Sequence, residues 1–183
     1  MDGRKRNLIY LTGFMGSGKS TIAPILANTL GYSIIDLDSE IEKSVGKKIS
    51  GIFDEKGETY FRDVERSLLI NASLQHGCVV SLGGGTISND ENLRVVKSSG
   101  ILVYLKTDLE HIVRRLRHKD DRPLLKSDEG SRLSESELRS RVKHLLTIRE
   151  PYYNQADVTI NTDNQRVGST VDEVVRSIRQ LIE

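Results

Sequence analysis

Residues 13–20 read Gly-Phe-Met-Gly-Ser-Gly-Lys-Ser, a full match to the phosphate-binding pattern G-x-x-x-x-G-K-[ST]. An apolar run at 8–11 precedes this stretch and a segment with helical spacing at 21–30 follows it, which is the strand–loop–helix context that the pattern requires. The glycines allow successive backbone N–H groups to turn inward and form a nest for phosphate oxygens. The following helix adds the positive end of its dipole, so we expect a nucleotide phosphate site here.

Two polar side chains at the end of this loop have defined tasks in such a site. We expect the Lys19 ammonium to reach the β- and γ-phosphates of ATP and the Ser20 hydroxyl to ligate Mg²⁺. ATP and Mg²⁺ are therefore the predicted cofactors. The other nucleotide-binding positions expected in the loop are Gly16, Ser17, Gly18 and Thr21.

Apolar runs alternate with helical segments along the whole chain. The runs are continuous and rich in β-branched residues, as is typical of strands buried on both faces, and they lie at 8–11, 33–36, 78–82, 101–105 and 157–160. Helical spacing is found at 21–30, 59–74, 109–117, 135–147 and 170–182. This alternation predicts a three-layer α/β fold, in which helices cover both faces of a five-stranded parallel sheet.

The composition is that of an ordinary globular protein, with 37% hydrophobic and 29% charged residues among 183 and a net charge of +1. We expect one domain, residues 1–183. The small net charge argues against nucleic acid or a membrane surface as a partner. No segment approaches the roughly 20 apolar residues of a membrane span, and the run at 8–11 is too short for a signal peptide. Cys78 is the single cysteine, so no internal disulfide can form, and we expect a cytoplasmic location. We also expect a monomer.

The phosphate-binding loop occurs in several classes of protein, and two of them fit poorly. A GTPase needs D-x-x-G after a strand and N-K-x-D for guanine. Residues 54–57 match D-x-x-G but follow a helical stretch, and N-K-x-D does not occur. An assembly-type ATPase needs Asp-Glu at the end of an apolar strand, whereas the third expected strand ends in Ser81-Leu82 and three glycines. A small-molecule kinase is the class that remains.

Two carboxylates follow the second expected strand, in Asp36-Leu37-Asp38. In an extended segment both would point to the same side, at the carboxyl end of the sheet where open α/β folds bind ligands. One would help to hold Mg²⁺ and the other would meet the hydroxyl of a phosphoryl acceptor. The alternative is that Asp38 caps a helix beginning at Ser39.

Other polar features are open to a plain structural interpretation. The glycines at 83–85 suit either a close approach of backbone to a ligand or a flexible turn. Arg62 and Glu65 have the spacing of a common surface ion pair. Arg149 precedes Pro151, where an arginine can face the negative end of a helix dipole.

The segment 119–134 is polar and turn-rich, and a loop of this length in a compact domain is either functional or disordered. It contains Arg122 ahead of the rigid Pro123, and it ends where Ser134 and Glu137 have the spacing of a helix capping box. We expect this segment to be a mobile lid that orders when ligands bind.

Taken in chain order, these motifs resemble the shikimate kinase family, within the nucleoside monophosphate kinase-like branch of P-loop kinases. The resemblance extends over nearly the whole chain and rests on residues 13–21, 36–38, 61–65, 83–85, 122–125 and 149–153. It implies a P-loop kinase fold with a mobile lid. It also implies an ATP-dependent phosphotransferase that phosphorylates the 3-hydroxyl of shikimate, in the synthesis of chorismate and aromatic amino acids.

The resemblance assigns roles at the acceptor side of the site. The residues that would bind shikimate are Asp38, Arg62, Gly84, Gly85 and Arg149. Glu65 would hold Arg62 in place. Asp38 would also orient the acceptor hydroxyl and take its proton, so that the catalytic set would be Lys19, Asp38 and Arg122.

The resemblance also assigns roles at the nucleotide side of the site. Asp36 would lie near Mg²⁺ and act through water, and Arg122 would meet the phosphates from the lid. Arg115 would flank the adenine, and the loop at 162–165, which includes Gln165, would cover the other side of the base. Many family members have a proline in this loop, but residues 162–168 contain none.

Two other functions stay open at this stage. One is a related kinase that acts on a sugar acid or a nucleotide, and the other is an ATP-binding regulatory module without turnover. The intact set Lys19, Ser20, Asp38, Arg62 and Arg149 argues against the second, because a degraded site would have lost some of these residues.

Overall fold

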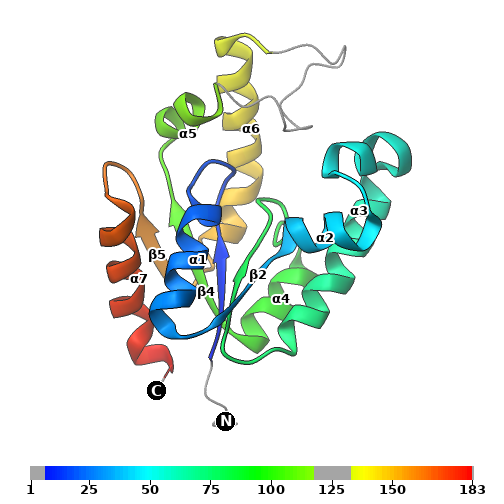
Figure 1. The fold of residues 1–183 in the computed structure, drawn as a ribbon. Helices are drawn as coiled ribbons and strands as arrows, with labels where there is room; N and C mark the ends of the chain where they lie inside the picture. The colour runs from blue at the N-terminus through cyan, green and yellow to red at the C-terminus, as the bar shows by residue number, and fades with distance from the viewer. Residues whose placement is uncertain (1–6, 118–132, 183) are drawn as a thin grey trace.

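The computed structural model describes residues 7–117 and 133–182 (Figure 1). Its strands are β1 (Leu8–Thr12), β2 (Ser33–Asp36), β3 (Cys78–Ser81), β4 (Ile101–Lys106) and β5 (Val158–Asn161). Its helices are α1 (Lys19–Leu30), α2 (Leu37–Val45), α3 (Ile49–Ser73), α4 (Asp90–Ser99), α5 (Leu109–Leu116), α6 (Glu135–Tyr153) and α7 (Val167–Ile182). The strands form one parallel sheet in the order β2-β3-β1-β4-β5.

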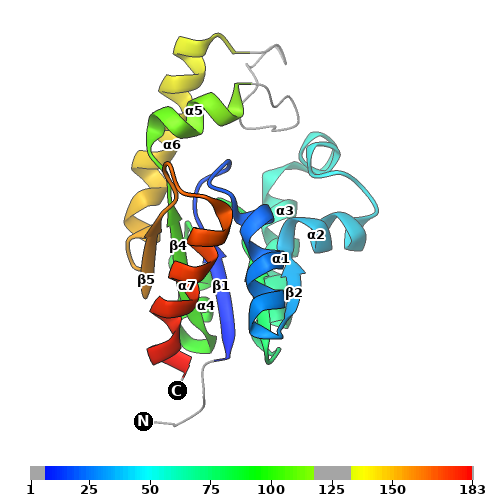
Figure 2. The ribbon, with the colours of Figure 1, turned by 60° about the vertical axis from the view of Figure 1, so that its left-hand side comes forward.

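Helices cover both faces of this sheet, as Figures 1 and 2 show. The central strand β1 displays the division, because its side chains alternate between two cores. Ile9 and Leu11 pack with α1 and α7, whereas Leu8 and Tyr10 pack with the helices of the opposite face, which include α3, α4 and α6. The predicted three-layer α/β fold is therefore confirmed.

The expectation that all five strands are buried on both faces is wrong at the two edges of the sheet. Ser33 and Ile34 of β2 are exposed, as are Thr159 and Asn161 of β5. The apolar run alone does not reveal which strands have a neighbour on each side, so edge strands could not be recognised from it.

Several helix boundaries also differ from the expected ranges. Helix α3 begins well before residue 59, with a break at Gly57, and α6 continues through Pro151 to Tyr153. Helices α2 and α4 lie outside the expected ranges. The D-x-x-G match at 54–57 lies within α3, which agrees with its rejection as a GTPase motif. The capping box of Ser134 with Glu137 is present.

The register of the sheet determines how the loops at its carboxyl edge lie relative to one another. Leu11 of β1 pairs with Ser81 of β3, and Thr12 pairs with Tyr104 of β4. The loops that follow these three strands therefore start at the same edge of the sheet, with β4 continuing two residues further to Lys106. Among the described helices, none combines the length and the apolar character needed to cross a membrane.

The turn between α4 and β4 provides a test of the packing. A Cβ atom added to Gly100 would collide with the carbonyl oxygen of Leu8 and would lie 2.9 Å from Cε2 of Tyr10. Both neighbours belong to the central strand and cannot move away. We expect Gly100→Ala to lower the free energy of unfolding by about 1–3 kcal/mol, measured by urea denaturation.

A matched control is Gly168→Ala in α7, where an added Cβ meets nothing within 4 Å. This change should be neutral or stabilise the protein by up to about 1 kcal/mol, since glycine is a poor helix residue. Equal stability of the two variants would contradict the packing described for Gly100.

Candidate active site

A cleft of about 1000 Å³ opens at the carboxyl edge of the sheet. It is lined by the phosphate-binding loop, the beginnings of α2 and α3, the turn after β3, α5 and the loop after β5. The predicted site residues that line it are Gly16, Ser17, Gly18, Lys19, Ser20, Thr21, Asp36, Asp38, Gly84, Arg115 and Gln165. Residues far apart in the sequence thus meet around one space.

The phosphate-binding loop follows β1 and has the backbone conformation that its glycines permit. Gly13, Gly16 and Gly18 have φ values of 143°, 84° and 102°, in the region that disfavours any residue with a Cβ atom. Nζ of Lys19 donates hydrogen bonds to the carbonyl oxygens of Gly13 at 2.6 Å and Phe14 at 3.1 Å. Because α1 begins at Lys19, the N-terminus of the helix faces the cleft.

Asp36 and Asp38 both line the cleft, but not for the reason expected from the sequence. Oδ1 of Asp36 accepts a hydrogen bond from the backbone N–H of Ser39 at 3.0 Å, so that Asp36 is the N-cap of α2. Asp38 lies in the first turn of this helix. The idea of two carboxylates alternating along an extended segment is therefore wrong, and so is the alternative that Asp38 is the cap.

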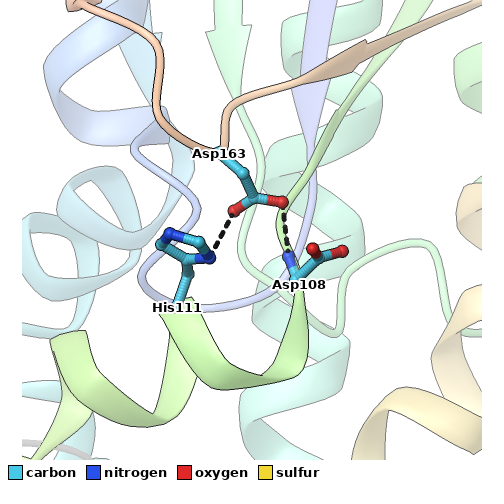
Figure 3. A group of neighbouring side chains, drawn as sticks. All are labelled: Asp108, His111 and Asp163. Atoms are coloured by element: carbon cyan, nitrogen blue, oxygen red, sulfur yellow. Dashed lines mark hydrogen bonds and ion pairs between the residues drawn. The ribbon is translucent and has the colours of Figure 1, made fainter.

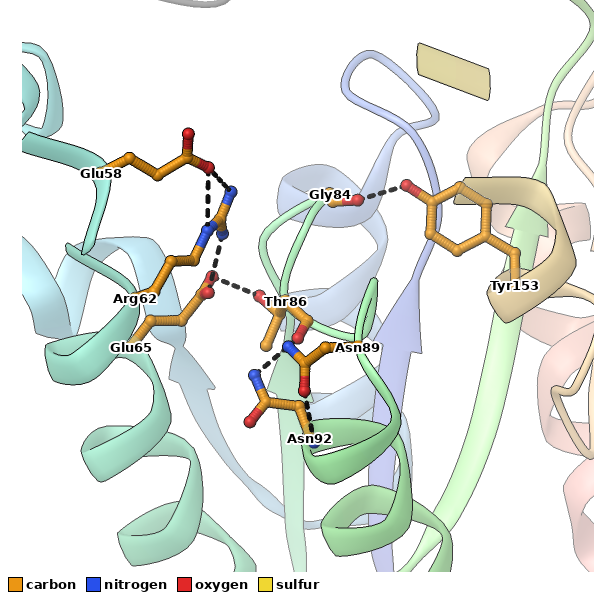
Figure 4. A network of polar contacts seen from close by, with 8 residues as sticks. All are labelled: Glu58, Arg62, Glu65, Gly84, Thr86, Asn89, Asn92 and Tyr153. Carbon is orange, nitrogen blue, oxygen red and sulfur yellow. Dashed lines mark hydrogen bonds and ion pairs between the residues drawn. The ribbon is translucent and has the colours of Figure 1, made fainter. Parts of the chain in front are cut away.

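Beside the cleft, a buried carboxylate joins α3 to the turn after β3 (Figure 4). The Glu65 side chain is 1% exposed. Oε2 of Glu65 accepts from Nη1 of Arg62 at 2.8 Å, and Oε1 accepts from Oγ1 of Thr86 at 2.7 Å. The carbonyl oxygen of Thr86 in turn accepts from Nδ2 of Asn92 at 2.7 Å. This network distinguishes the pair from an ordinary surface ion pair.

Arg62 is fixed from two sides. Its Nε and Nη2 atoms donate to Oε1 of Glu58 at 3.2 and 3.0 Å, in addition to the contact with Glu65. Burial alone would lower the pKa of the guanidinium, but the charges and hydrogen bonds of Glu65 and Glu58 outweigh it and raise the pKa above its usual value. Arg62 is therefore a permanent cation with a restricted position.

A second arginine reaches the same turn from α6. Arg149 is 6% exposed, and α6 continues beyond it to Tyr153, so its role as a helix-terminal charge is not supported. A Cβ atom placed on Gly85 would lie 3.1 Å from Nη2 of Arg62 and 3.4 Å from Nη2 of Arg149. The Tyr153 hydroxyl donates to the carbonyl oxygen of Gly84 and fixes α6 against the turn (Figure 4). Two cations thus converge at the glycines, an arrangement suited to an anion.

The other end of the cleft is bounded by α5 and the loop after β5. Nη1 of Arg115 donates to the carbonyl oxygen of Gly16 at 2.8 Å, which places α5 against the phosphate-binding loop. Gln165 lines the cleft from the loop after β5. Arg122 and most of the expected lid at 119–134 lie outside the described residues.

The sequence analysis missed one wall of the cleft, formed by α2, the start of α3 and the connection between them. The cleft-lining residues of this wall are Ser39, Glu42, Lys48, Ile49 and Ser50. Oε1 of Glu42 accepts from the backbone N–H of Ile49 at 3.0 Å and holds the connection in place. The sequence carries no local motif for these residues, because only the fold brings them to the cleft.

A group of possible metal ligands lies elsewhere, at the start of α5 (Figure 3). Asp108, His111 and Asp163 each offer an atom within 4.8 Å of the others. However, none of them lines the cleft. The Asp163 carboxylate contacts the backbone N–H of Asp108 and the ring of His111. The predicted Mg²⁺ ligands, Ser20 and Asp36, are in a different place.

Comparison with known proteins identifies the family. A family model described as shikimate kinase matches residues 15–182. The shikimate kinase of Chlorobium phaeobacteroides is 49% identical over 179 residues, which cover 98% of this chain and 94% of that protein. The chain belongs to the shikimate kinase family. The family and the ATP-dependent kinase activity inferred from the sequence are thereby confirmed.

Solved structures agree with this membership of the shikimate kinase family. The shikimate kinase from Acinetobacter baumannii, in complex with shikimate, has a TM-score of 0.86 and 33% identity, and the match covers 94% of this chain and 93% of that one. A gluconokinase from Sinorhizobium meliloti has a TM-score of 0.61 at 17% identity, covering 98% and 95% of the two chains. At that identity the likeness concerns the fold alone.

The position of Lys19 in the loop leads to a first test of the site. We expect Lys19→Ala to lower kcat by on the order of 10²–10³, because the ammonium would stabilise charge that develops on the transferred group. Turnover is measured by coupling ADP formation to NADH oxidation. The exposed Lys43 of α2, which pairs with Glu40, supplies the control Lys43→Ala. A Lys19→Ala enzyme with a tenth of the original activity would contradict this role.

Proposed function

We propose that this chain transfers the γ-phosphoryl group of ATP to the 3-hydroxyl of shikimate, giving shikimate 3-phosphate and ADP in the synthesis of chorismate and aromatic amino acids. The observation that carries the proposal is the convergence of Arg62 and Arg149 at Gly85, beside the cleft that holds the phosphate-binding loop. An acceptor with a carboxylate and a hydroxyl can bridge these two places.

At the acceptor side, the two guanidinium groups bind the carboxylate of shikimate. Planar guanidinium groups match a carboxylate with paired hydrogen bonds, which an ammonium group does not. Glu65 holds Arg62 in the required position. Gly84 and Gly85 have no side chains that would fill the space between the arginines, so the acceptor can approach the backbone.

Between the acceptor side and the phosphate-binding loop lies Asp38. Its Oδ1 atom would be 2.8 Å from a Cβ atom on Gly83, so it is next to the turn after β3, and it lines the same cleft as Lys19. Asp38 orients the acceptor hydroxyl and accepts its proton. Lys19 stabilises the transferred group. Phosphoryl transfer requires little more than this positioning and charge stabilisation.

On the nucleotide side, the donor set fits Mg²⁺. The Ser20 hydroxyl and the Asp36 carboxylate are oxygen ligands of the kind Mg²⁺ prefers, and both line the cleft. Ser20 would bind the ion directly and Asp36 through a water molecule. When bound, the ion neutralises charge on the phosphates.

The remaining predicted contacts surround the nucleotide. Arg115 flanks the adenine and Gln165 covers its other side. Arg122 meets the phosphates from the lid at 119–134, whose closure excludes water as a competing acceptor.

We further propose that residues 1–183 form a single domain that acts as a monomer in the cytoplasm, on small molecules and without nucleic-acid or membrane partners. The small net charge and the buried Cys78 thiol support this placement. No feature of the described cleft favours a nucleotide or a sugar acid as acceptor over shikimate, or a module without turnover.

The direct test is turnover of ATP in the presence of shikimate, gluconate or CMP, each at the same concentration. We expect kcat/KM for shikimate to exceed that for the other two acceptors by several orders of magnitude. ATP hydrolysis that no acceptor stimulates would favour the regulatory module. Preferential use of gluconate or CMP would mean that this compound, and not shikimate, is the acceptor.

The role of Asp38 can be separated from a contribution to stability. Asp38→Asn keeps the shape of the side chain and an acceptor oxygen but removes its charge and basicity. We expect kcat to fall by roughly 10²–10⁴ while the affinity for ATP changes little. If the melting temperature falls and kcat does not, Asp38 serves helix α2 instead.

The arginine pair predicts how acceptor analogues behave. A hydrogen bond to a charged group contributes roughly 1.5–3 kcal/mol, and about 1.4 kcal/mol corresponds to a factor of ten. We therefore expect Arg62→Lys to raise KM for shikimate by about ten- to a hundredfold and to leave KM for ATP unchanged. KM for the uncharged methyl ester of shikimate should be raised at least as much with the unaltered enzyme, because the ester offers no charged acceptor to either guanidinium group and Arg149 is buried.

The control for this pair is Arg66→Lys, one helical turn along α3, where the exposed arginine contacts Glu91. This change should leave both KM values as they are. Phosphorylation of the ester as readily as the acid would show that the arginines do not bind the acceptor carboxylate.

A further inference from the structure

Helix α5 and the loop after β5 are joined at the edge of the nucleotide side of the cleft. Strands β4 and β5 pair in parallel up to Lys106 and Asn161, so the chain leaves both strands at the same level. Immediately beyond, Oγ1 of Thr107 and Oγ1 of Thr162 lie 2.6 Å apart in a buried hydrogen bond. The first residues of each connection are thus tied together.

The Asp163 carboxylate continues this connection (Figure 3). Its side chain is 7% exposed. Oδ2 of Asp163 accepts from the backbone N–H of Asp108 at 2.9 Å, and Oδ1 lies 3.2 Å from Nδ1 of His111. Asp108 is the N-cap of α5 but makes no capping hydrogen bond with its own side chain. A carboxylate from another loop therefore supplies the negative charge that a helix N-terminus favours.

The next residue of the loop is also held by α5. Asn164 has a φ of 59°, unusual for a residue other than glycine, and its Oδ1 lies 3.3 Å from Nε2 of His111. On the far side of the turn, Oε1 of Gln165 accepts from Oγ1 of Thr170 at 3.3 Å. His111 and Asp163 together hold the turn that presents Gln165 to the cleft. We call Asp108, His111 and Asp163 the α5 clasp.

The clasp therefore links the two walls of one end of the cleft. Arg115 lies one helical turn after His111 on α5, lines the cleft and donates to the carbonyl oxygen of Gly16. Gln165 lines the cleft two residues after Asp163. We propose that His111 and Asp163 are positioning residues for the base of the nucleotide, because they join the helix that carries Arg115 to the turn that carries Gln165. This inference rests on the proposed nucleotide site but not on the identity of the acceptor.

The test distinguishes the contribution of the base to nucleotide binding from that of the phosphates. Binding of Mg²⁺–ADP and of tripolyphosphate is measured by calorimetry for the unaltered protein, His111→Ala, Asp163→Ala and the double variant. We expect each single change to weaken ADP binding by about tenfold, the scale of one lost contact. Tripolyphosphate binding should not change, since it has no base to contact Arg115 and Gln165. The double variant should be no worse than either single one, because the two residues act as a unit.

Two further variants control for stability. Asp163→Asn keeps an oxygen that can accept from the Asp108 N–H, so it should recover most of the ADP affinity. His144→Ala, at an exposed position of α6, should leave the affinity for ADP unchanged. In steady-state assays the clasp variants should raise KM for ATP and leave KM for shikimate unchanged.

Three outcomes would overturn the proposal. One is a lower melting temperature with ADP affinity within twofold of the original. A second is an equal loss of ADP and tripolyphosphate binding, which would mean that the clasp supports the whole site. A third is an unaltered protein that does not bind ADP. A protein that binds ADP as expected but does not phosphorylate shikimate would refute the proposed function and leave this inference standing.

Discussion

The parallel register of β1 between β3 and β4 is the constraint on which the rest of the structure depends. All five residues of β1 are buried, and apolar contacts on both faces of the sheet hold the strand in the centre. Since Leu11 pairs with Ser81 and Thr12 with Tyr104, the chain leaves all three strands at the same edge of the sheet. The phosphate-binding loop, the triple glycine turn and α5 therefore face one another without any direct sequence relation.

The buried carboxylate of Glu65 fixes the position of α3 relative to the turn after β3. A carboxylate removed from water is costly unless it is paired and hydrogen-bonded. Arg62 and Thr86 both donate to it, so the cost is offset only when α3 and the turn after β3 lie in their observed relation. The same interaction leaves Arg62 beside Arg149 at Gly85. Two cations this close repel each other, and an anionic acceptor, as we propose, would relieve that repulsion.

Features with a local sequence pattern were predicted well. The loop at 13–20 predicted the strand–loop–helix unit, because its glycines and its lysine lie within one short stretch. The Arg62–Glu65 contact was predicted from helical spacing. Thr86, the third member of that network, was not, because it is distant in sequence and carries no motif of its own.

Errors arose where a boundary or a long-range contact decided the geometry. Asp38 was placed on an extended segment, but capping by Asp36 starts α2 at Leu37, two residues before Ser39, and changes the reason why both carboxylates reach the cleft. The exposed edges of β2 and β5 depend on the strand order, which apolar runs do not encode. The α5 clasp joins residues of α5 to a loop beyond β5, so only the pairing of β4 with β5 reveals it.

The central claim is that two arginines beside the cleft bind the acceptor carboxylate, so that the acceptor hydroxyl meets the phosphate-binding loop. The most direct measurement is a crystal structure of this chain with shikimate and Mg²⁺–ADP. We expect the carboxylate to accept hydrogen bonds from both Arg62 and Arg149 and the 3-hydroxyl to lie within hydrogen-bond distance of Asp38. Shikimate bound with its carboxylate away from the two arginines, or with another hydroxyl at Asp38, would contradict the account.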